Sequence, residues 1–209
     1  MHVGIVAEGP SDLILLEALI RVLRPDVVVT RIQPEATLGE RGSGWKGVRS
    51  WCREFGDDLS SVMTADPDDI IDVLLIHVDC SMAHNVSAAR ACPPASDTAD
   101  ALQSVVVAEW LGLAARPSWL FVATPSASSD TWVTSVLAPP PTTLEVLECV
   151  PAHLIEAHLV ARRLLRRKTN GQVAKSARRY ETYAQDVAAK IDVLRAACTE
   201  ADRFCAQIS

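Results

Sequence analysis

The sequence lacks several features that would assign it to a specialised class. Aromatic residues make up only 5% of the chain, and no apolar run is long enough and free enough of charge to span a bilayer. The start has no basic segment followed by an apolar core, so we expect no secretory signal. A chain of 209 residues can bury enough surface to fold as one compact domain without a disulfide. We therefore expect a cytoplasmic protein that does not act at a membrane.

The six cysteines have no spacing typical of a metal or redox site, and most are expected to be buried apolar fillers. A zinc site from His77, Asp79, Cys80 and His84 has suitable ligand types. On a strand, however, Cys80 points away from the face that His77 and Asp79 share. The Gly-x-Ser-x-Gly turn of many serine hydrolases is also missing. These absences argue against zinc and serine chemistry.

A glycine-rich loop at residues 39–47 lies between a predicted strand and a predicted helix, as a phosphate-binding loop would. Trp45 separates Gly44 from Lys46, and Gly47 stands where the Mg²⁺-binding Ser or Thr of such a loop belongs. The loop therefore does not favour nucleotide hydrolysis.

Charge is distributed unevenly along the chain, although the net charge is only -6. Residues 1–160 hold 9 basic and 21 acidic side chains, a net charge of -12, whereas residues 161–179 hold 8 basic and no acidic ones, a net charge of +8. An acidic region and a compact basic segment therefore coexist. The basic segment has the charge density that contact with a phosphate backbone requires.

Short apolar runs alternate with helical patterns through residues 1–138. Strands are predicted at 2–7, 27–32, 72–78 and 119–123, and helices at 11–24, 47–63 and 99–111. This alternation predicts an α/β fold: a Rossmann-like open sheet, mostly parallel, of about four strands with helices on both faces. After the prolines at 139–141, helices are predicted at 151–167 and 176–207. We expect residues 139–209 to form a helical C-terminal extension packed on the same fold.

Acidic side chains follow three of the predicted strands. Glu8 and Asp12 follow the first strand, Asp79 and Ser81 the third, and Asp130 the fourth. Because the carboxyl ends of parallel strands face one crevice, these side chains are expected to meet there. Clustered hard oxygen ligands suit Mg²⁺ or Mn²⁺. The alternative is that Asp12 and Asp130 cap helices and Asp79 closes a turn.

Two segments resemble the Toprim domain and the OLD-type nucleases that share its layout. Residues 4–12, GIVAEGPSD, and 74–81, LLIHVDCS, match a strand ending in Glu-Gly and a strand ending in Asp-x-Asp. The resemblance covers about residues 1–135. It implies a Rossmann-like sheet, with Glu8 as the acid/base residue and Asp79 as a Mg²⁺ ligand. Asp12 matches a second acidic residue of the OLD-type branch.

The resemblance implies a metal-dependent nuclease that cleaves DNA or RNA with bound Mg²⁺ or Mn²⁺. Its metal set would be Glu8, Asp12, Asp79, Ser81 and Asp130, in which Asp130 stands in loosely for a later acidic residue. Ser81 is a departure, because it replaces the second aspartate of Asp-x-Asp. A neutral hydroxyl weakens metal affinity and puts full activity in doubt.

The basic segment is expected to bind the nucleic acid, with Lys175 also stabilising charge in the transition state. Its predicted contacts are Arg166, Arg167, Lys168, Lys175, Arg178 and Arg179. The alternative is a solvated helix face with a turn at Asn170 and Gly171. A different functional class also stays open: a non-catalytic Toprim-like module that regulates or docks onto a partner such as an ATPase.

Overall fold

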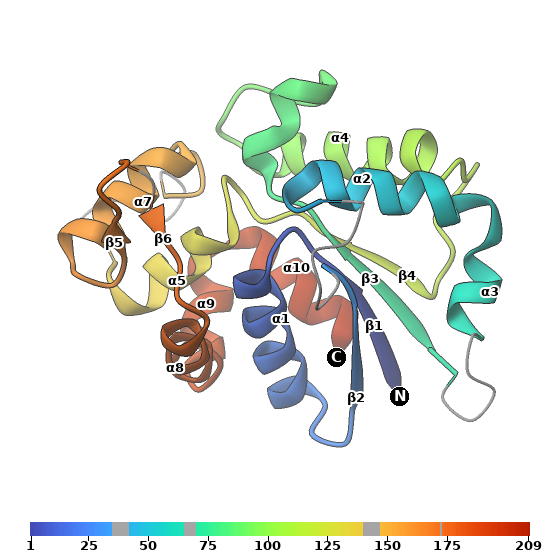
Figure 1. The fold of residues 1–209 in the computed structure, drawn as a ribbon, viewed down its shortest axis with the longest axis horizontal. Coiled ribbons are helices and arrows are strands. Elements are labelled where there is room, and N and C mark those ends of the chain that lie inside the picture. The colour runs from blue at the N-terminus through green and yellow to red at the C-terminus, as the bar shows by residue number, and fades with distance from the viewer. Residues whose placement is uncertain (35–41, 65–69, 140–146, 172) are drawn as a thin grey trace.

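A four-stranded parallel sheet forms the centre of the molecule (Figure 1). The computed structural model describes residues 1–34, 42–64, 70–139, 147–171 and 173–209. The strands are β1 (His2–Val6), β2 (Val28–Gln33), β3 (Val73–His77) and β4 (Leu120–Ala123), in the order β2-β1-β3-β4. The predicted α/β fold with a parallel four-stranded sheet is confirmed.

Burial explains why β1 and β3 occupy the middle of the sheet. Every residue of both strands is buried, whereas β2 at the edge is largely exposed or half-buried. A central parallel strand is covered on both faces and so needs a continuous apolar run. Alternate residues of β3 enter different cores: Val73 and Leu75 pack on one face of the sheet, and Leu74 and Ile76 on the other.

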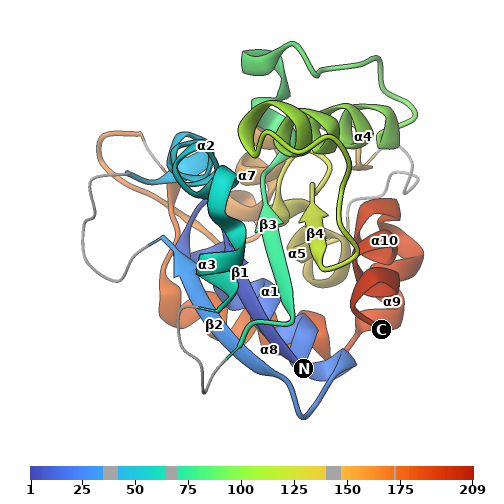
Figure 2. The same cartoon turned by 90° about the vertical axis from the view of Figure 1, so that its right-hand side faces the viewer.

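One face of the sheet is covered by helices from both ends of the chain. These are α1 (Pro10–Leu23), α5 (Ser129–Leu137), α8 (Ala177–Ala188), α9 (Ile191–Ala197) and α10 (Thr199–Ile208). They share one hydrophobic core with the strands, so the C-terminal helices pack directly on the α/β unit (Figures 1 and 2).

The opposite face carries the remaining helices of the first part of the chain. They are α2 (Gly44–Phe55), η1 (Gly56–Asp58), α3 (Leu59–Met63), η2 (Cys80–Val86), α4 (Ser96–Val105) and η3 (Val106–Trp110). The single helix predicted at 47–63 is thus broken at Gly56. A Cβ atom there would lie 2.7 Å from the carbonyl oxygen of Leu111, so the close packing of these segments requires glycine.

The long helix predicted at 151–167 is wrong. Helix α7 (Ala152–Ala161) ends early, and a hairpin of β5 (Arg166–Arg167) and β6 (Val173–Ala174) follows. Arg163 adopts a left-handed conformation with φ of 62°, which turns the chain so that Leu165 is buried in the core. Burial of this leucine overrides the helical spacing of the sequence. The predicted turn at Asn170 and Gly171 is present.

The predicted helix at 176–207 is also wrong in detail, because α8, α9 and α10 replace it. The chain leaves helical geometry at Lys190 and again at Cys198, whose φ of -135° and ψ of 116° are extended. Cys198 is buried at this corner. The bend lets α9 pack against α5 while α10 contacts α1 and β4.

One disulfide joins Cys92 to Cys149, two residues 57 positions apart. Nothing in the cysteine spacing indicated this pair. The four other cysteines are free and buried, as predicted for apolar fillers. Among the described residues, no helix combines the length and apolarity that crossing a bilayer demands.

Gly56→Ala should destabilise the protein by about 1–3 kcal/mol, because the added methyl group meets backbone that cannot move freely. Its backbone is already helical, so the substitution introduces no conformational strain of its own. Urea unfolding measures the effect. Ser104→Ala, on the exposed side of α4, is the control and should change the free energy of unfolding by less than about 0.5 kcal/mol. An unchanged urea midpoint for Gly56→Ala would contradict the close approach of Gly56 to the backbone of Leu111.

Candidate metal centre

The candidate site lies at the topological switch point of the sheet, between β1 and β3. The chain passes from β1 to β2 on one side and then crosses to β3 on the other, so the segments that follow β1 and β3 meet at the carboxyl end of the sheet, where open parallel sheets bind their ligands. Glu8 follows β1 and Asp79 follows β3. The backbone N–H of Asp79 donates a hydrogen bond of 2.7 Å to Oε1 of Glu8. The two predicted residues are therefore adjacent.

Asp12 joins them from the first turn of α1, where its side chain is buried. Ser129, at the start of α5, links it to Asp79. The Ser129 hydroxyl donates to Oδ1 of Asp12 at 2.6 Å, and the Ser129 backbone N–H donates to Oδ1 of Asp79 at 3.0 Å. One serine thus fixes two carboxylates. Glu8, Asp12 and Asp79 are called the carboxylate cluster below.

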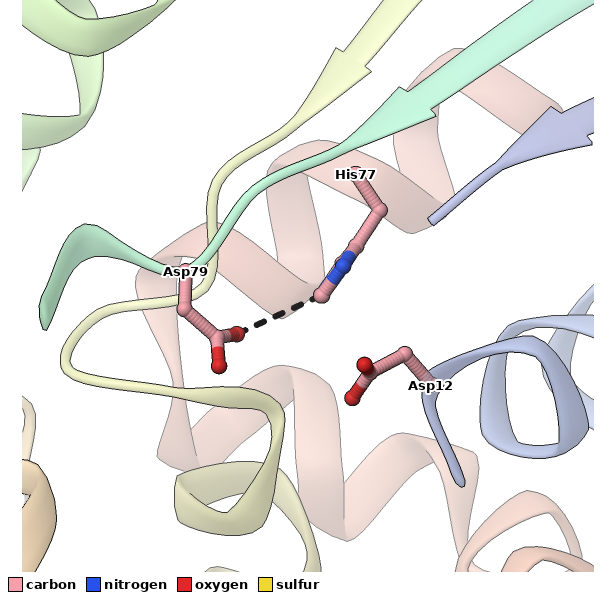
Figure 3. Close-up of side chains that lie close together, drawn as sticks. All are labelled: Asp12, His77 and Asp79. Atoms are coloured by element: carbon pink, nitrogen blue, oxygen red, sulfur yellow. Dashed lines mark ion pairs between the residues drawn. The ribbon is translucent and has the colours of Figure 1, made fainter. Parts of the chain in front are cut away.

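His77 lies against this cluster from the last position of β3 (Figure 3). Its side chain is fully buried, and its Nε2 atom lies 3.4 Å from Oδ1 of Asp79. One ligand atom each from Asp12, His77 and Asp79 can be chosen so that all three lie within 4.8 Å of one another. Residues 77 and 79 share a face of the strand, as predicted, and Cys80 points away to bond the carbonyl oxygen of Thr124.

Burial makes the charged form of the cluster unfavourable, and the pKa values of its residues are shifted accordingly. Burial raises the pKa of Glu8 to about 7, against the lowering effect of hydrogen bonds from the backbone of Asp79 and Trp45. Burial, and then the charges of Asp12 and Glu8, raise the pKa of Asp79 well above its ordinary value. Burial lowers the pKa of His77, which keeps the imidazole neutral. A bound cation would relieve the repulsion between the carboxylates.

Asp130 is buried beside the cluster but already has cationic and hydrogen-bonding partners. Its Oδ2 atom forms an ion pair of 2.7 Å with Nζ of Lys175, and the hydroxyl of Tyr180 donates to Oδ1. Burial alone would lower the pKa of Lys175, but the carboxylate of Asp130 raises it. The lysine therefore stays charged, and its charge also acts on Glu8 and Asp79. Asp130 is less available to a metal ion than the other carboxylates.

Ser81 is exposed, and its backbone N–H donates to the carbonyl oxygen of Ala127. It lines a neighbouring cavity of about 320 Å³ together with His84, Arg90, Ser126, Glu148 and His153. Its predicted role as a metal ligand stays a prediction. Cys80 and Ser81, which line the cavity, directly follow Asp79 in the chain.

The predicted nucleic-acid contacts divide into two groups. Arg166, Arg167 and Lys168 are exposed on the β5–β6 hairpin, and Arg178 and Arg179 lie in the first turn of α8, the first exposed and the second half-buried. The hairpin lies on the side of the molecule toward which the strands run (Figure 1). Lys175 directly follows β6 and reaches back to Asp130, so it connects the basic hairpin to the candidate metal centre.

Sequence reasoning missed three residues of the site: His77 as a neighbour of Asp12, Ser129, and Tyr180. The signal for His77 was present, because alternate residues of a strand share a face. Ser129 carried a weaker signal as a serine at a predicted strand end. Tyr180 carried none, since its contact with Asp130 depends on how α8 packs against α5.

No family model, no curated protein and no solved structure matches this chain. The Toprim resemblance therefore rests on the residues at 4–12 and 74–81 alone and stays a prediction.

The metal-free protein should lose stability as the pH rises from about 4.5 through 7. The pKa of Glu8 is raised in the folded state, so its protonated form favours folding, and that stability disappears as the folded group ionises. A shift from 4.5 to about 7 corresponds to about 3 kcal/mol. Glu8→Gln should flatten this part of the pH profile of urea unfolding.

Glu181→Gln removes an exposed carboxylate of α8 and is the matched control. It should leave the pH profile unchanged. The same profile for wild type and Glu8→Gln would show that Glu8 is not the buried, strained carboxylate described above.

Proposed function

We propose that this protein is a nuclease that uses Mg²⁺ or Mn²⁺ to cleave phosphodiester bonds in DNA or RNA. The observation that carries the proposal is the carboxylate cluster: three acidic side chains converge at the reversal point of a parallel sheet, and two have raised pKa values. The residues fit a divalent cation, because carboxylate oxygens are its preferred ligands and a fully buried histidine lies beside them. Such a cation supplies polarisation of a phosphoryl oxygen and activation of water.

Glu8 has the properties of a general base near neutral pH. In the metal-free protein, burial raises its pKa to about 7, near the operating pH at which proton transfer is most effective. The Asp79 N–H holds one of its oxygens and so fixes the direction of the carboxylate. We infer that Glu8 accepts the proton of the attacking water while Asp12 and Asp79 bind the cation.

Lys175 fits a role in balancing charge at the substrate phosphate. Its ammonium group pairs with Asp130 and acts electrostatically on Glu8 and Asp79, while its side chain stays 29% exposed. The exposed hairpin residues Arg166, Arg167 and Lys168 supply positive charge along the path that leads to it. A polyanionic strand would meet this surface first.

The Asp130–Lys175 pair favours a second candidate function. It neutralises part of the acidic site without a metal ion, as a non-catalytic module would require. In this alternative, the chain docks onto a partner such as an ATPase through its basic hairpin. Metal-dependent cleavage separates the two functions.

A cytoplasmic location stays a prediction. The Cys92–Cys149 disulfide weighs against a strongly reducing compartment, because disulfides are rare where thiols are kept reduced.

The purified protein with Mg²⁺ or Mn²⁺ should cleave plasmid DNA, single-stranded DNA or RNA, and Glu8→Gln or Asp79→Asn should slow cleavage by at least about 100-fold. Both substitutions keep an oxygen that can accept the existing hydrogen bonds, so the fold should persist. A gel assay with circular dichroism as the folding check measures the effect. Glu181→Gln should cleave at the wild-type rate. Absence of cleavage on all three substrates would reject the nuclease.

Removing the hairpin charges should weaken binding of nucleic acid without disturbing the metal centre. The triple variant Arg166→Gln, Arg167→Gln, Lys168→Gln should lower the slope of log affinity against log salt by about 0.7–0.9 for each lost phosphate contact. Filter binding at several salt concentrations measures the slope. The double variant Arg53→Gln, Lys190→Gln removes exposed charges elsewhere and is the control. An unchanged slope for the triple variant would show that the hairpin is a solvated surface that does not contact nucleic acid.

A further inference from the structure

We infer that His77 is a direct metal ligand, and that the site formed by Asp12, His77 and Asp79 therefore selects Mn²⁺ over Mg²⁺. The inference deepens the proposed function, since it names the metal of the same site, but it does not require that the protein cleave anything. The Toprim resemblance assigns no role to this histidine.

The first reason to assign His77 as a ligand is that its ring lacks hydrogen-bond partners among the described residues. Its ring is fully buried, and within the part of the chain that the structure describes neither ring nitrogen has a hydrogen-bond partner. Its 3.4 Å approach to Asp79 lacks hydrogen-bond geometry. A buried polar group left unpaired destabilises the folded state. Coordination by Nε2 would satisfy one of the two ring nitrogens, and the ring lies toward the two carboxylates (Figure 3).

The spacing of the donors is the second reason. The three ligand atoms lie within 4.8 Å of one another. Ligands on opposite sides of Mg²⁺ are about 4 Å apart, because each bond is about 2.0–2.1 Å long. A small movement of the side chains would therefore let one ion bind all three donors. The Asp79 side chain is 14% exposed and the His77 side chain is not exposed at all, so Asp79 is the ligand nearer to solvent, from which water or a phosphate oxygen would complete the coordination.

The rigidity of the donors is the third reason. His77 ends β3, the central strand, and Ser129 holds one oxygen of both Asp12 and Asp79. A site whose ligands are fixed discriminates between metal ions by the type of ligand atom as well as by charge. Imidazole nitrogen is a good ligand for transition metals, whereas Mg²⁺ favours oxygen and gives up its water reluctantly. Compared with Mg²⁺, a transition metal such as Mn²⁺ is therefore favoured by the mixed nitrogen and carboxylate set.

The experiment is electron paramagnetic resonance of Mn²⁺ added to protein stripped of metal. Binding should remove the signal of the free aqueous ion, and pulsed spectra should show coupling to a directly bound nitrogen. Competition with Mg²⁺ should give an affinity for Mn²⁺ at least tenfold higher. His77→Gln replaces the nitrogen with an amide, and it should abolish the nitrogen coupling and reduce the Mn²⁺ preference at least tenfold. His84→Gln, at an exposed histidine of the neighbouring cavity, should change neither.

The wild-type spectrum alone decides the inference if His77→Gln fails to fold. Bound Mn²⁺ without nitrogen coupling, or a coupling that persists in a folded His77→Gln protein, would overturn it and leave the nuclease proposal standing. Bound Mn²⁺ with nitrogen coupling but no cleavage would support the inference and reject the nuclease proposal. Absence of Mn²⁺ binding would overturn the inference, and the cleavage assay with Mg²⁺ would then decide the nuclease proposal separately.

Discussion

The organisation of the site depends on repulsion between carboxylates that the fold does not allow to separate. Glu8, Asp12 and Asp79 come from the ends of two adjacent parallel strands and the helix after the first. Hydrogen bonds from the Asp79 backbone and from Ser129 hold them in place. Burial removes the water that would otherwise screen their charges. The protein therefore stores an electrostatic cost that protons relieve at low pH and that a divalent cation can relieve at neutral pH.

The surrounding residues divide the remaining charge in a consistent way. Lys175 neutralises Asp130 by an ion pair, and the hydroxyl of Tyr180 donates a hydrogen bond to the same carboxylate. The carboxylate cluster receives only the longer-range effect of the lysine. Lys175 is thus the side chain that links the basic hairpin to the acidic residues of the site. The negative total charge of the protein thus hides two regions of opposite sign that meet at the site.

Sequence patterns predicted the sheet and its acidic edge because both follow from local periodicity. The continuous apolar run of β3 required a central strand, and its end placed Asp79 beside Glu8. The hairpin at Arg166 and Arg167 was missed, since burial of Leu165 is a tertiary gain that overrides helical spacing. The isolation of His77 and the Asp130–Lys175 pair could not be predicted, because they depend on how distant segments pack.

Calorimetric titration of Mn²⁺ in buffers of different ionisation enthalpy tests the central claim most directly. At pH 6.5, below the pKa of about 7 for Glu8, the cluster holds protons that a bound cation must displace. The account predicts saturable binding with proton release into the buffer, and less release for Glu8→Gln. Saturable binding with no proton release, or no binding at all, would contradict the claim that these carboxylates form a divalent-metal site.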